Sequence, residues 1–295
     1  MNPEITSTDR LVDRLSRAKA LDPVANAIQG LVRKALEGTG PLAPVRDLLH
    51  GKPLGHSLHV ALSDVPVGAW TMAAVFDSLE LCGRDEFAAA ADLAVAVGLA
   101  GGLGAIATGL AEWADTKDEP KRLGLVHALS NDFAFGVYSL ALVLRRTGRR
   151  RAGLATALAG YAVVSFAAYL GGELSLGHQI GVRHTAVPRE PADAFVSVLP
   201  ENELGALPKT ADLGGIPLLL SRDRRGDIHA VAAVCTHRGG PLGEGSFADG
   251  CVTCPWHGGR FDLTDGTVLE GPATFPLARF ETRVLQGQIQ ARRMY

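Results

Sequence analysis

The residues best suited to chemistry lie near the C-terminus, in two short segments that each pair a cysteine with a histidine. Cys235 precedes His237 by two positions, and Cys254 precedes His257 by three. Two thiolates and two imidazoles are the ligand set of a 2Fe–2S cluster with both cysteines on one iron and both histidines on the other. Thiolate suits the iron that stays ferric, whereas neutral imidazole adds no charge and favours the iron that accepts the electron. We therefore expect these four side chains to bind the metal.

The residues around the ligands strengthen this interpretation. The segments read Cys-Thr-His-Arg-Gly-Gly-Pro-Leu from Cys235 and Cys-Pro-Trp-His-Gly-Gly-Arg-Phe-Asp from Cys254. Glycines beside the ligands let the backbone approach sulfur closely, and prolines stiffen the loops. Over roughly residues 192–295 the sequence resembles the Rieske [2Fe-2S] family, which implies a small all-β domain. A structural zinc site also uses mixed Cys and His ligands and is the alternative.

Within this family, the chain is similar to the low-potential, ferredoxin-type members. The high-potential branch has a further cysteine in each loop, joined as a disulfide, where this chain has Gly240 and Trp256. Gly259 stands where a hydroxyl-bearing residue often follows the second His-Gly pair. Fewer hydrogen bonds to sulfur and no disulfide predict a potential of about −150 mV, at the low end of the Rieske range.

Two cysteines stand outside the ligand set. We expect Cys251 to be a small buried side chain in a strand. Because it lies three residues before Cys254, a role as an alternative cluster ligand stays open. Cys82 follows a hydrophobic stretch and has no evident partner in the sequence.

The part of the chain before residue 190 is strongly apolar. Of 295 residues, 47% are hydrophobic and 20% are charged, with a mean hydropathy of +0.14. About 20 apolar residues are needed to cross a bilayer. Four stretches are long enough: Ser57–Phe76, Phe87–Ala111, Leu123–Leu144 and Ala152–Gly172. A soluble helical bundle is the alternative, but stretches that are apolar around their whole circumference favour membrane insertion.

The first and third stretches look like copies of each other. His59 to Asp64 aligns without gaps to His127 to Asp132, and Trp70 aligns with Tyr138 at the same offset of 68 residues. We interpret this as a two-plus-two repeat whose halves are related by a pseudo-twofold axis along the membrane normal. Chance similarity between apolar segments is the alternative.

The same region, roughly Gly51–Val187, resembles an uncharacterised four-helix bacterial membrane family. The resemblance rests on Gly55-His56-Ser57-Leu58-His59-Val60, which lacks two prolines of the family pattern, and on the later run from Asp64 to Trp70. We therefore predict a multidomain chain, with an all-α four-helix transmembrane bundle followed by a small all-β Rieske domain. The predicted boundaries are an amphipathic N-terminal segment at 1–50, the membrane domain at 51–187 and the Rieske domain at 192–295.

Histidines gather on one side of the predicted bundle. Antiparallel spans bring to that side His50, His56, His59, His127, His178 and His184, together with Asp64, Asp132, Glu112 and Glu173. Charged groups in a membrane suggest a functional site. Three interpretations remain open: a b-type haem held by His59 and His127, a quinone or proton site that adds Asp64 and Asp132, or polar residues that pair at the interface.

These observations predict a membrane-anchored, ferredoxin-like Rieske protein that carries single electrons. The alternatives are a subunit of a quinone- or haem-dependent membrane oxidoreductase and a redox sensor. We expect no catalytic residue, because no room follows the last expected strands for the mononuclear iron of an oxygenase. The expected partners are a reductase or oxidase protein and membrane lipid. A net charge of −2 argues against nucleic acid.

The expected location is the bacterial cytoplasmic membrane. The basic loop 145–151 favours the cytoplasm for its own side, which would place the cluster outside. A charged N-terminal segment without a visible signal peptide favours the opposite orientation, and we expect a cytoplasmic cluster.

Overall fold

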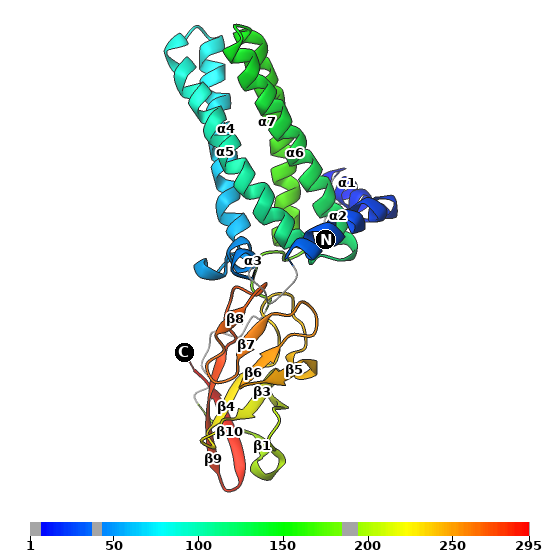
Figure 1. Cartoon of the computed structure of the whole chain (residues 1–295), viewed down its shortest axis with the longest axis vertical. Coiled ribbons are helices and arrows are strands. Elements are labelled where there is room, and N and C mark those ends of the chain that lie inside the picture. The colour runs from blue at the N-terminus through cyan, green and yellow to red at the C-terminus, as the bar shows by residue number, and fades with distance from the viewer. Residues whose placement is uncertain (1–6, 37–42, 185–193, 295) are drawn as a thin grey trace, which may run out of the picture. The chain divides into compact units, whose positions relative to one another are not determined.

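The structure is a computed structural model that describes residues 7–36, 43–184 and 194–294. Its contacts divide the chain into two compact units. The first contains the described residues of 1–39 and 58–180 and is helical, whereas the second contains those of 40–57 and 181–295 and is rich in strands. This confirms the predicted fold class (Figure 1).

The two units do not follow the chain in simple order. Residues 40–57 precede the long helices in sequence but belong by their contacts to the second, strand-rich unit. The boundary predicted at residue 50 therefore falls inside one compact unit. The predicted N-terminal segment accordingly contributes to both units.

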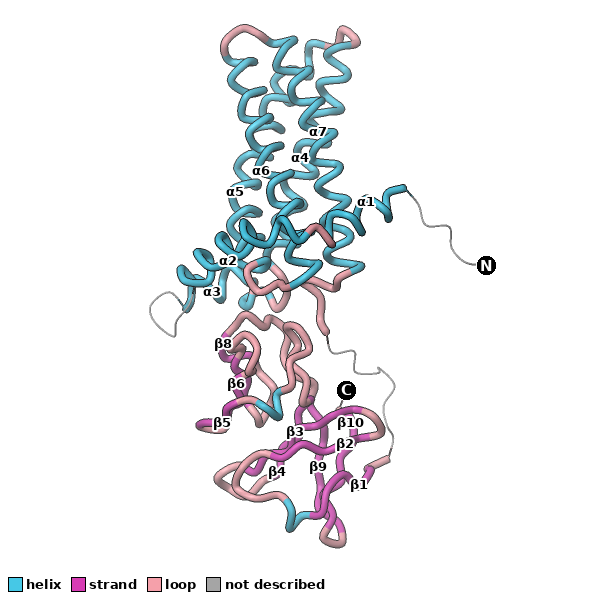
Figure 2. Tube along the Cα trace, turned by 90° about the vertical axis from the view of Figure 1, so that its right-hand side faces the viewer, coloured by secondary structure: helices cyan, strands magenta, loops and turns pink. Residues whose placement is uncertain are grey.

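The helices that form the bundle of the first unit are long, and the helices that precede them in the sequence are short (Figure 2). They are α1 (Ser7–Ser16), α2 (Asp22–Leu36), α3 (Ala43–His50), α4 (Leu58–Leu81), α5 (Ala88–Trp113), α6 (Asp118–Arg146) and α7 (Arg150–Gly172). A five-residue π-helical turn, Glu173–Gly177, extends α7. Of these, α3 belongs to the second unit.

The number of helices suited to crossing a membrane differs from the prediction of four. Among the described residues, three helices are long and apolar enough to cross a membrane: Leu58–Leu81, Asp85–Trp113 and Arg150–Gly177. The predicted third span, Leu123–Leu144, lies in α6, which is helical throughout but is not among them. The reason is that the polar run around His127, Asn131 and Asp132 lowers the hydropathy of its first half.

Two aligned residues of the repeat, 68 positions apart, meet in the middle of the bundle. The rings of Trp70 on α4 and Tyr138 on α6 stack with centroids 4.2 Å apart and an interplanar angle of 7°. Glycines let the neighbouring helices approach these rings, because a Cβ at Gly98 would lie 2.2 Å from Trp70 Nε1 and one at Gly160 would lie 3.2 Å from Tyr138 Cε2. The stacked pair therefore forms the centre of the helical core.

Another pair of residues 68 positions apart, Asp77 and Arg145, forms an ion pair. Asp77 on α4 accepts a hydrogen bond of 2.5 Å from Arg145 on α6, and neither side chain has any exposed surface. Arg145 also contacts Asp92 on α5 at 3.1 Å. Arg150 on α7 pairs with Asp92 and with Glu80 on α4. All four long helices thus share one ion network at the end of the bundle where α4 meets α5 and α6 meets α7.

Helices α1 and α2 pack on the opposite end of the bundle. The side-chain amide of Gln29 on α2 is buried and donates to the carbonyl oxygens of Trp113 and Thr116. Arg122 at the start of α6 makes a two-pronged ion pair with Asp22 at 2.9 Å. The two hydrogen bonds from Gln29 satisfy carbonyl oxygens at the end of α5 and just after it, where no further helical turn supplies N–H partners. Residues 7–36 are thereby attached to the bundle.

The second unit contains two antiparallel sheets. The larger has the order β1-β10-β9-β4-β3-β2 and the smaller the order β5-β6-β7-β8. The strands are β1 (Val196–Pro200), β2 (Lys209–Leu213), β3 (Ile216–Arg222), β4 (Ile228–Ala232), β5 (Ser246–Ala248), β6 (Cys251–Thr253), β7 (Arg260–Asp262), β8 (Val268–Glu270), β9 (Arg279–Leu285) and β10 (Gln288–Arg293).

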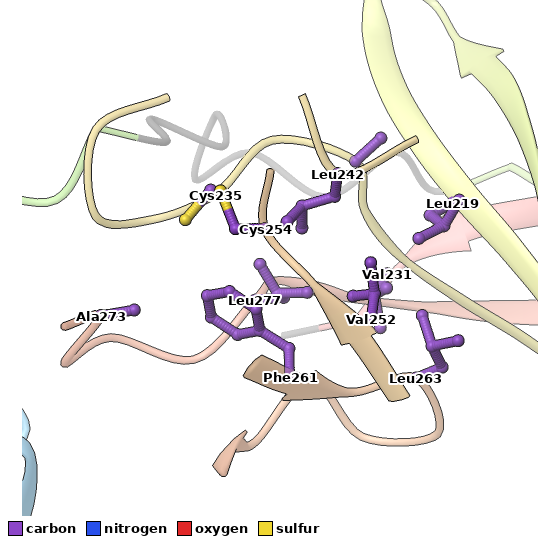
Figure 3. Packing of buried hydrophobic residues seen from close by; sticks show 11 residues of the cluster. Leu219, Val231, Cys235, Leu242, Val252, Cys254, Phe261, Leu263, Ala273 and Leu277 are labelled. Carbon is purple, nitrogen blue, oxygen red and sulfur yellow. The ribbon is translucent and has the colours of Figure 1, made fainter. Parts of the chain in front are cut away.

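Both faces of the larger sheet are covered. Leu218, Leu219 and Leu220 on β3 are all fully buried, although successive side chains in a strand point to opposite faces. Leu219 packs with Val252 and Phe261 of the smaller sheet, whereas its two neighbours belong to a separate core cluster on the other face. Figure 3 shows Cys235 and Cys254 next to each other in the core cluster that contains Leu219. The shared core thus supports the two cysteine-bearing loops.

Candidate functional site

Two loops of matching conformation carry the predicted ligands. One follows β4 and begins at Cys235, and the other connects β6 to β7 and begins at Cys254. In each, the cysteine N–H donates to the carbonyl five residues later, at 2.8 Å in both loops. The cysteine carbonyl accepts from the N–H four residues later, which belongs to Gly239 or Gly258. These glycines have φ angles of 73° and 72°, a conformation that strongly favours glycine and explains its place in each loop.

The loops bring the two sulfur atoms together in a cradle of backbone amides. The N–H groups of His237 and Arg238 point to the sulfur of Cys235, and those of Trp256 and His257 point to the sulfur of Cys254. A Cβ at Gly240 would lie only 2.8 Å from Cys254 Sγ, so any larger residue there would press against the sulfur. Such a Cβ would also meet the Trp256 ring at 3.2 Å. Gly240 and the Trp256 indole, which stand where the similar high-potential proteins have a further pair of cysteines, therefore lie close together beside the sulfur of Cys254.

The two thiols are chemically coupled. Hydrogen bonding from Cys235 lowers the pKa of Cys254 to about 6, and the amides of Trp256 and His257 favour its thiolate further. The same hydrogen bond, together with burial, raises the pKa of Cys235. One thiolate therefore forms readily, but a second negative charge beside it is costly without a cation. A metal ion that binds both sulfurs supplies that positive charge.

The two histidines complete the set. The ring centroids of His237 and His257 are 5.0 Å apart, with an interplanar angle of 88°. Burial and the positive charge of Arg238 lower the pKa of His237 well below 6.5. Its imidazole is therefore neutral near pH 7, which is the form that ligates metal. Two adjacent sulfurs and two adjacent imidazoles match the donor set of a 2Fe–2S cluster.

Cys251 has a different environment. It lies on β6, is buried, and directs its sulfur to the carbonyl oxygen of Asp249 at 3.5 Å. It is absent from the core cluster that includes Cys235 and Cys254. These contacts favour the expected role as a small buried side chain.

A segment from before the long helices packs beside the ligand loops. In α3, Asp47 accepts a hydrogen bond from the N–H of Gly271 at 3.0 Å and pairs with Lys52 at 2.8 Å. Lys52 also donates to the carbonyl oxygen of Leu269. His50 of the same helix is buried, and His50 and His184 both lie near enough to His237 to add to the lowering of its pKa. The sequence had placed these histidines only on the same side of the membrane.

The predicted residues of the membrane half line a single cavity of about 370 Å³ inside the first unit. His59 and Asp64 reach it from α4, and His127 and Asp132 reach it from α6. The imidazole centroids are 6.4 Å apart. Glu112, also predicted on this side, lines the same cavity, whereas His178 is not among the lining residues.

The groups that orient these two rings were not predicted from the sequence. Nδ1 of His59 is 2.9 Å from the carbonyl oxygen of Ala105, and Nδ1 of His127 is 2.8 Å from that of Ala167. A Cβ at Gly109 would lie 2.8 Å from His59 Cε1, and one at Gly171 would lie 3.0 Å from His127 Cε1. Both the carbonyls and the glycines are 62 residues apart, an offset between α5 and α7 that could have identified them.

Comparisons with known proteins match each unit to a family. Residues 193–281 match the family model of the Rieske [2Fe-2S] domain. Residues 55–184 match the model of a family described as a predicted membrane protein, DUF2231.

The relatives with assigned functions are similar to the second unit. Ferredoxin CarAc of Metapseudomonas resinovorans is 34% identical over 86 residues, which cover 29% of this chain and 78% of that protein. Human apoptosis-inducing factor 3 is 30% identical over 105 residues, which cover 36% of this chain but only 17% of that protein. Among solved structures, the ferredoxin of carbazole 1,9a-dioxygenase from Nocardioides aromaticivorans IC177 is 25% identical, with a TM-score of 0.32, over 34% of this chain and 97% of that one.

Proposed function

Through residues 193–281 the chain belongs to the Rieske [2Fe-2S] family, and on this premise we propose that it is a membrane-anchored, low-potential electron carrier of the ferredoxin type. The bound cluster takes up and releases one electron. The observation that carries the proposal is the convergence of Cys235, His237, Cys254 and His257 in two loops with the same hydrogen bonds. The three apolar helices support the membrane anchor.

The test is a visible absorption spectrum of the detergent-purified protein, first air-oxidised and then reduced with dithionite. We expect broad iron–sulfur bands that bleach on reduction, together with two iron atoms per chain. A protein that contains zinc and has no visible bands would contradict the proposal.

The chain's own residues would also define where a redox partner binds. Trp256 is 53% exposed, and its ring centroid lies 6.4 Å from that of its neighbour His257. Large aromatic side chains contribute much of the binding energy at protein interfaces. We therefore place the contact with a reductase or oxidase protein on the second ligand loop.

The proposed low reduction potential of the cluster can be tested by adding a hydroxyl group at Gly259. Its Cβ position has only ordinary contacts, the nearest being Ala273 Cβ at 3.6 Å, so a small side chain is tolerated. By resemblance to family members with a hydroxyl there, Gly259→Ser is expected to donate a hydrogen bond to the cluster region and raise the potential by about 60 mV, or tenfold in the one-electron equilibrium. Redox titration measures the shift. Gly259→Ala is the matched control, and an equal shift in both variants would exclude the hydroxyl as the cause.

The proposed orientation places the Rieske unit on the cytoplasmic side of a bacterial inner membrane. It can be tested with Cys82, which is exposed in the connection between α4 and α5, whereas the other three cysteines are buried. This connection lies at the end of the bundle opposite the C-terminal end of α7, which leads to the Rieske unit. In intact cells we expect a membrane-impermeant maleimide to label Cys82 and not the Cys82→Ser variant. If Cys82 is labelled only in permeabilised cells, Cys82 lies on the cytoplasmic side and the proposed orientation is wrong.

A further inference from the structure

The cavity of the first unit has the chemistry of a binding site. Its volume of about 370 Å³ is in the range of small-molecule pockets. Its walls combine the aromatic rings of Trp70, Trp113 and Phe135 with a few polar side chains from α4 and α6. Polar groups are costly inside a bundle unless they meet a partner, so their convergence on one space is informative.

The two histidines and the two aspartates of this cavity can accept hydrogen bonds. A carbonyl oxygen can only accept, so the contacts of His59 and His127 with Ala105 and Ala167 assign the ring hydrogen to Nδ1. In each neutral imidazole Nε2 is then an acceptor. The carboxylate oxygens of Asp64 and Asp132 are acceptors as well.

The two halves of the cavity differ in one respect. Asn131 lies one turn after His127, and its amide nitrogen is 3.2 Å from His127 Nε2. The repeat-related residue in the first half is Ser63, whose hydroxyl donates instead to the carbonyl oxygen of Val60. His59 is therefore the imidazole that is better placed to accept from a ligand.

We propose that this cavity binds the ring of a quinol, with His59 as the main acceptor of a quinol hydroxyl and the aromatic side chains against the ring. A quinol is planar, apolar on its faces, and presents hydroxyl donors at its edge. That the donor-bearing ligand is a quinol, rather than another hydroxyl compound, rests on the proposed electron-carrier function. A haem fits less well, because no lysine or arginine is among the described residues that line the cavity to pair with its propionates.

Acceptor-rich walls predict a preference for the reduced ligand. The hydroxyls of a quinol donate hydrogen bonds, whereas the carbonyl oxygens of the corresponding quinone only accept them. We expect decylubiquinol to bind the full-length, cluster-containing protein in detergent at least tenfold more tightly than decylubiquinone, as measured by anaerobic titration calorimetry. Equal affinity for the two forms would contradict the assigned acceptor roles.

Substitutions locate the binding. His59→Ala is expected to weaken decylubiquinol binding about tenfold, through loss of one hydrogen bond in a buried site. Ala128→Phe, which places a ring in the cavity, is expected to abolish binding. His178→Ala, outside the cavity, is the matched control and should leave the affinity unchanged. Thermal unfolding of each variant would show whether the bundle remains folded.

Three outcomes would overturn the proposal. One is the same decylubiquinol affinity in the wild-type, His59→Ala and Ala128→Phe proteins. Another is no binding by a protein whose iron–sulfur bands bleach normally with dithionite, which would leave the electron-carrier proposal intact. The third is an intense Soret band in the purified protein that disappears in His59→Ala and His127→Ala, which would make the cavity a haem site.

Discussion

Replacing Cys235 by serine in the full-length protein is expected to remove the iron–sulfur absorption bands and to reduce the iron content to near zero. The serine hydroxyl is far less acidic than the thiol and is a poor ligand for an iron that requires thiolate. His257→Ala removes one of the two imidazoles and is expected to have the same result. Absorption spectra and iron analysis of the purified variants provide the measurement.

The chain supplies a close control for this experiment. Cys251 is also buried in the second unit, yet its sulfur contacts the Asp249 carbonyl. Cys251→Ser should therefore retain the cluster, although the protein is expected to lose some stability. Retention of a Rieske spectrum in Cys235→Ser, or loss of it in Cys251→Ser alone, would refute the ligand assignment. The second result would make Cys251 a ligand in place of Cys254.

Replacing Arg145 by methionine is expected to destabilise the helical unit by about 3–5 kcal/mol, the cost of leaving a buried charge without its partner. Arg145 is fully buried and pairs with Asp77, which is equally buried. Its loss would also remove one of the two arginines that contact Asp92. The thermal unfolding midpoint in detergent, followed by circular dichroism, should fall by many degrees.

Two further variants test the cause of this loss. Arg146→Met changes the next residue in α6, which is exposed, and should have little effect on the midpoint. The double variant Asp77→Leu with Arg145→Met removes both buried charges and should recover most of the stability, since apolar pairs can replace buried ion pairs. A double variant as unstable as Arg145→Met alone would mean that packing, and not the unpaired carboxylate, explains the loss.

The candidate cluster residues could be proposed from the sequence because they lie within short segments. The spacing of Cys235, His237, Cys254 and His257, together with the flanking glycines, is a local pattern, and the two glycine φ angles are what that pattern requires. The facing of His59 with His127 and of Trp70 with Tyr138 was also accessible, because an offset of 68 residues reveals the repeat. The same offset relates Asp77 to Arg145, but sequence analysis did not extend the alignment that far.

The number of apolar spans was misjudged because length was weighed above composition. The polar residues of the cavity lower the hydropathy of α6, so its length predicts a span whereas its composition does not. The placement of α3, in contrast, depends on a tertiary contact that no local pattern encodes. The docking of α3 on the second unit rests on Asp47 and the Gly271 amide, a contact between distant parts of the chain. Neither the sequence around Asp47 nor that around Gly271 indicates the other.

The position of α3 in the chain has a consequence for biosynthesis. Asp47 leaves the ribosome 224 residues before Gly271, its hydrogen-bond partner. At roughly 5–20 residues per second, translation of the intervening segment takes on the order of 10–45 s. During that time α4 to α7 are all synthesised, while α3 has no completed surface on which to dock. The contact that holds α3 in the second unit can therefore form only after Gly271 has been translated.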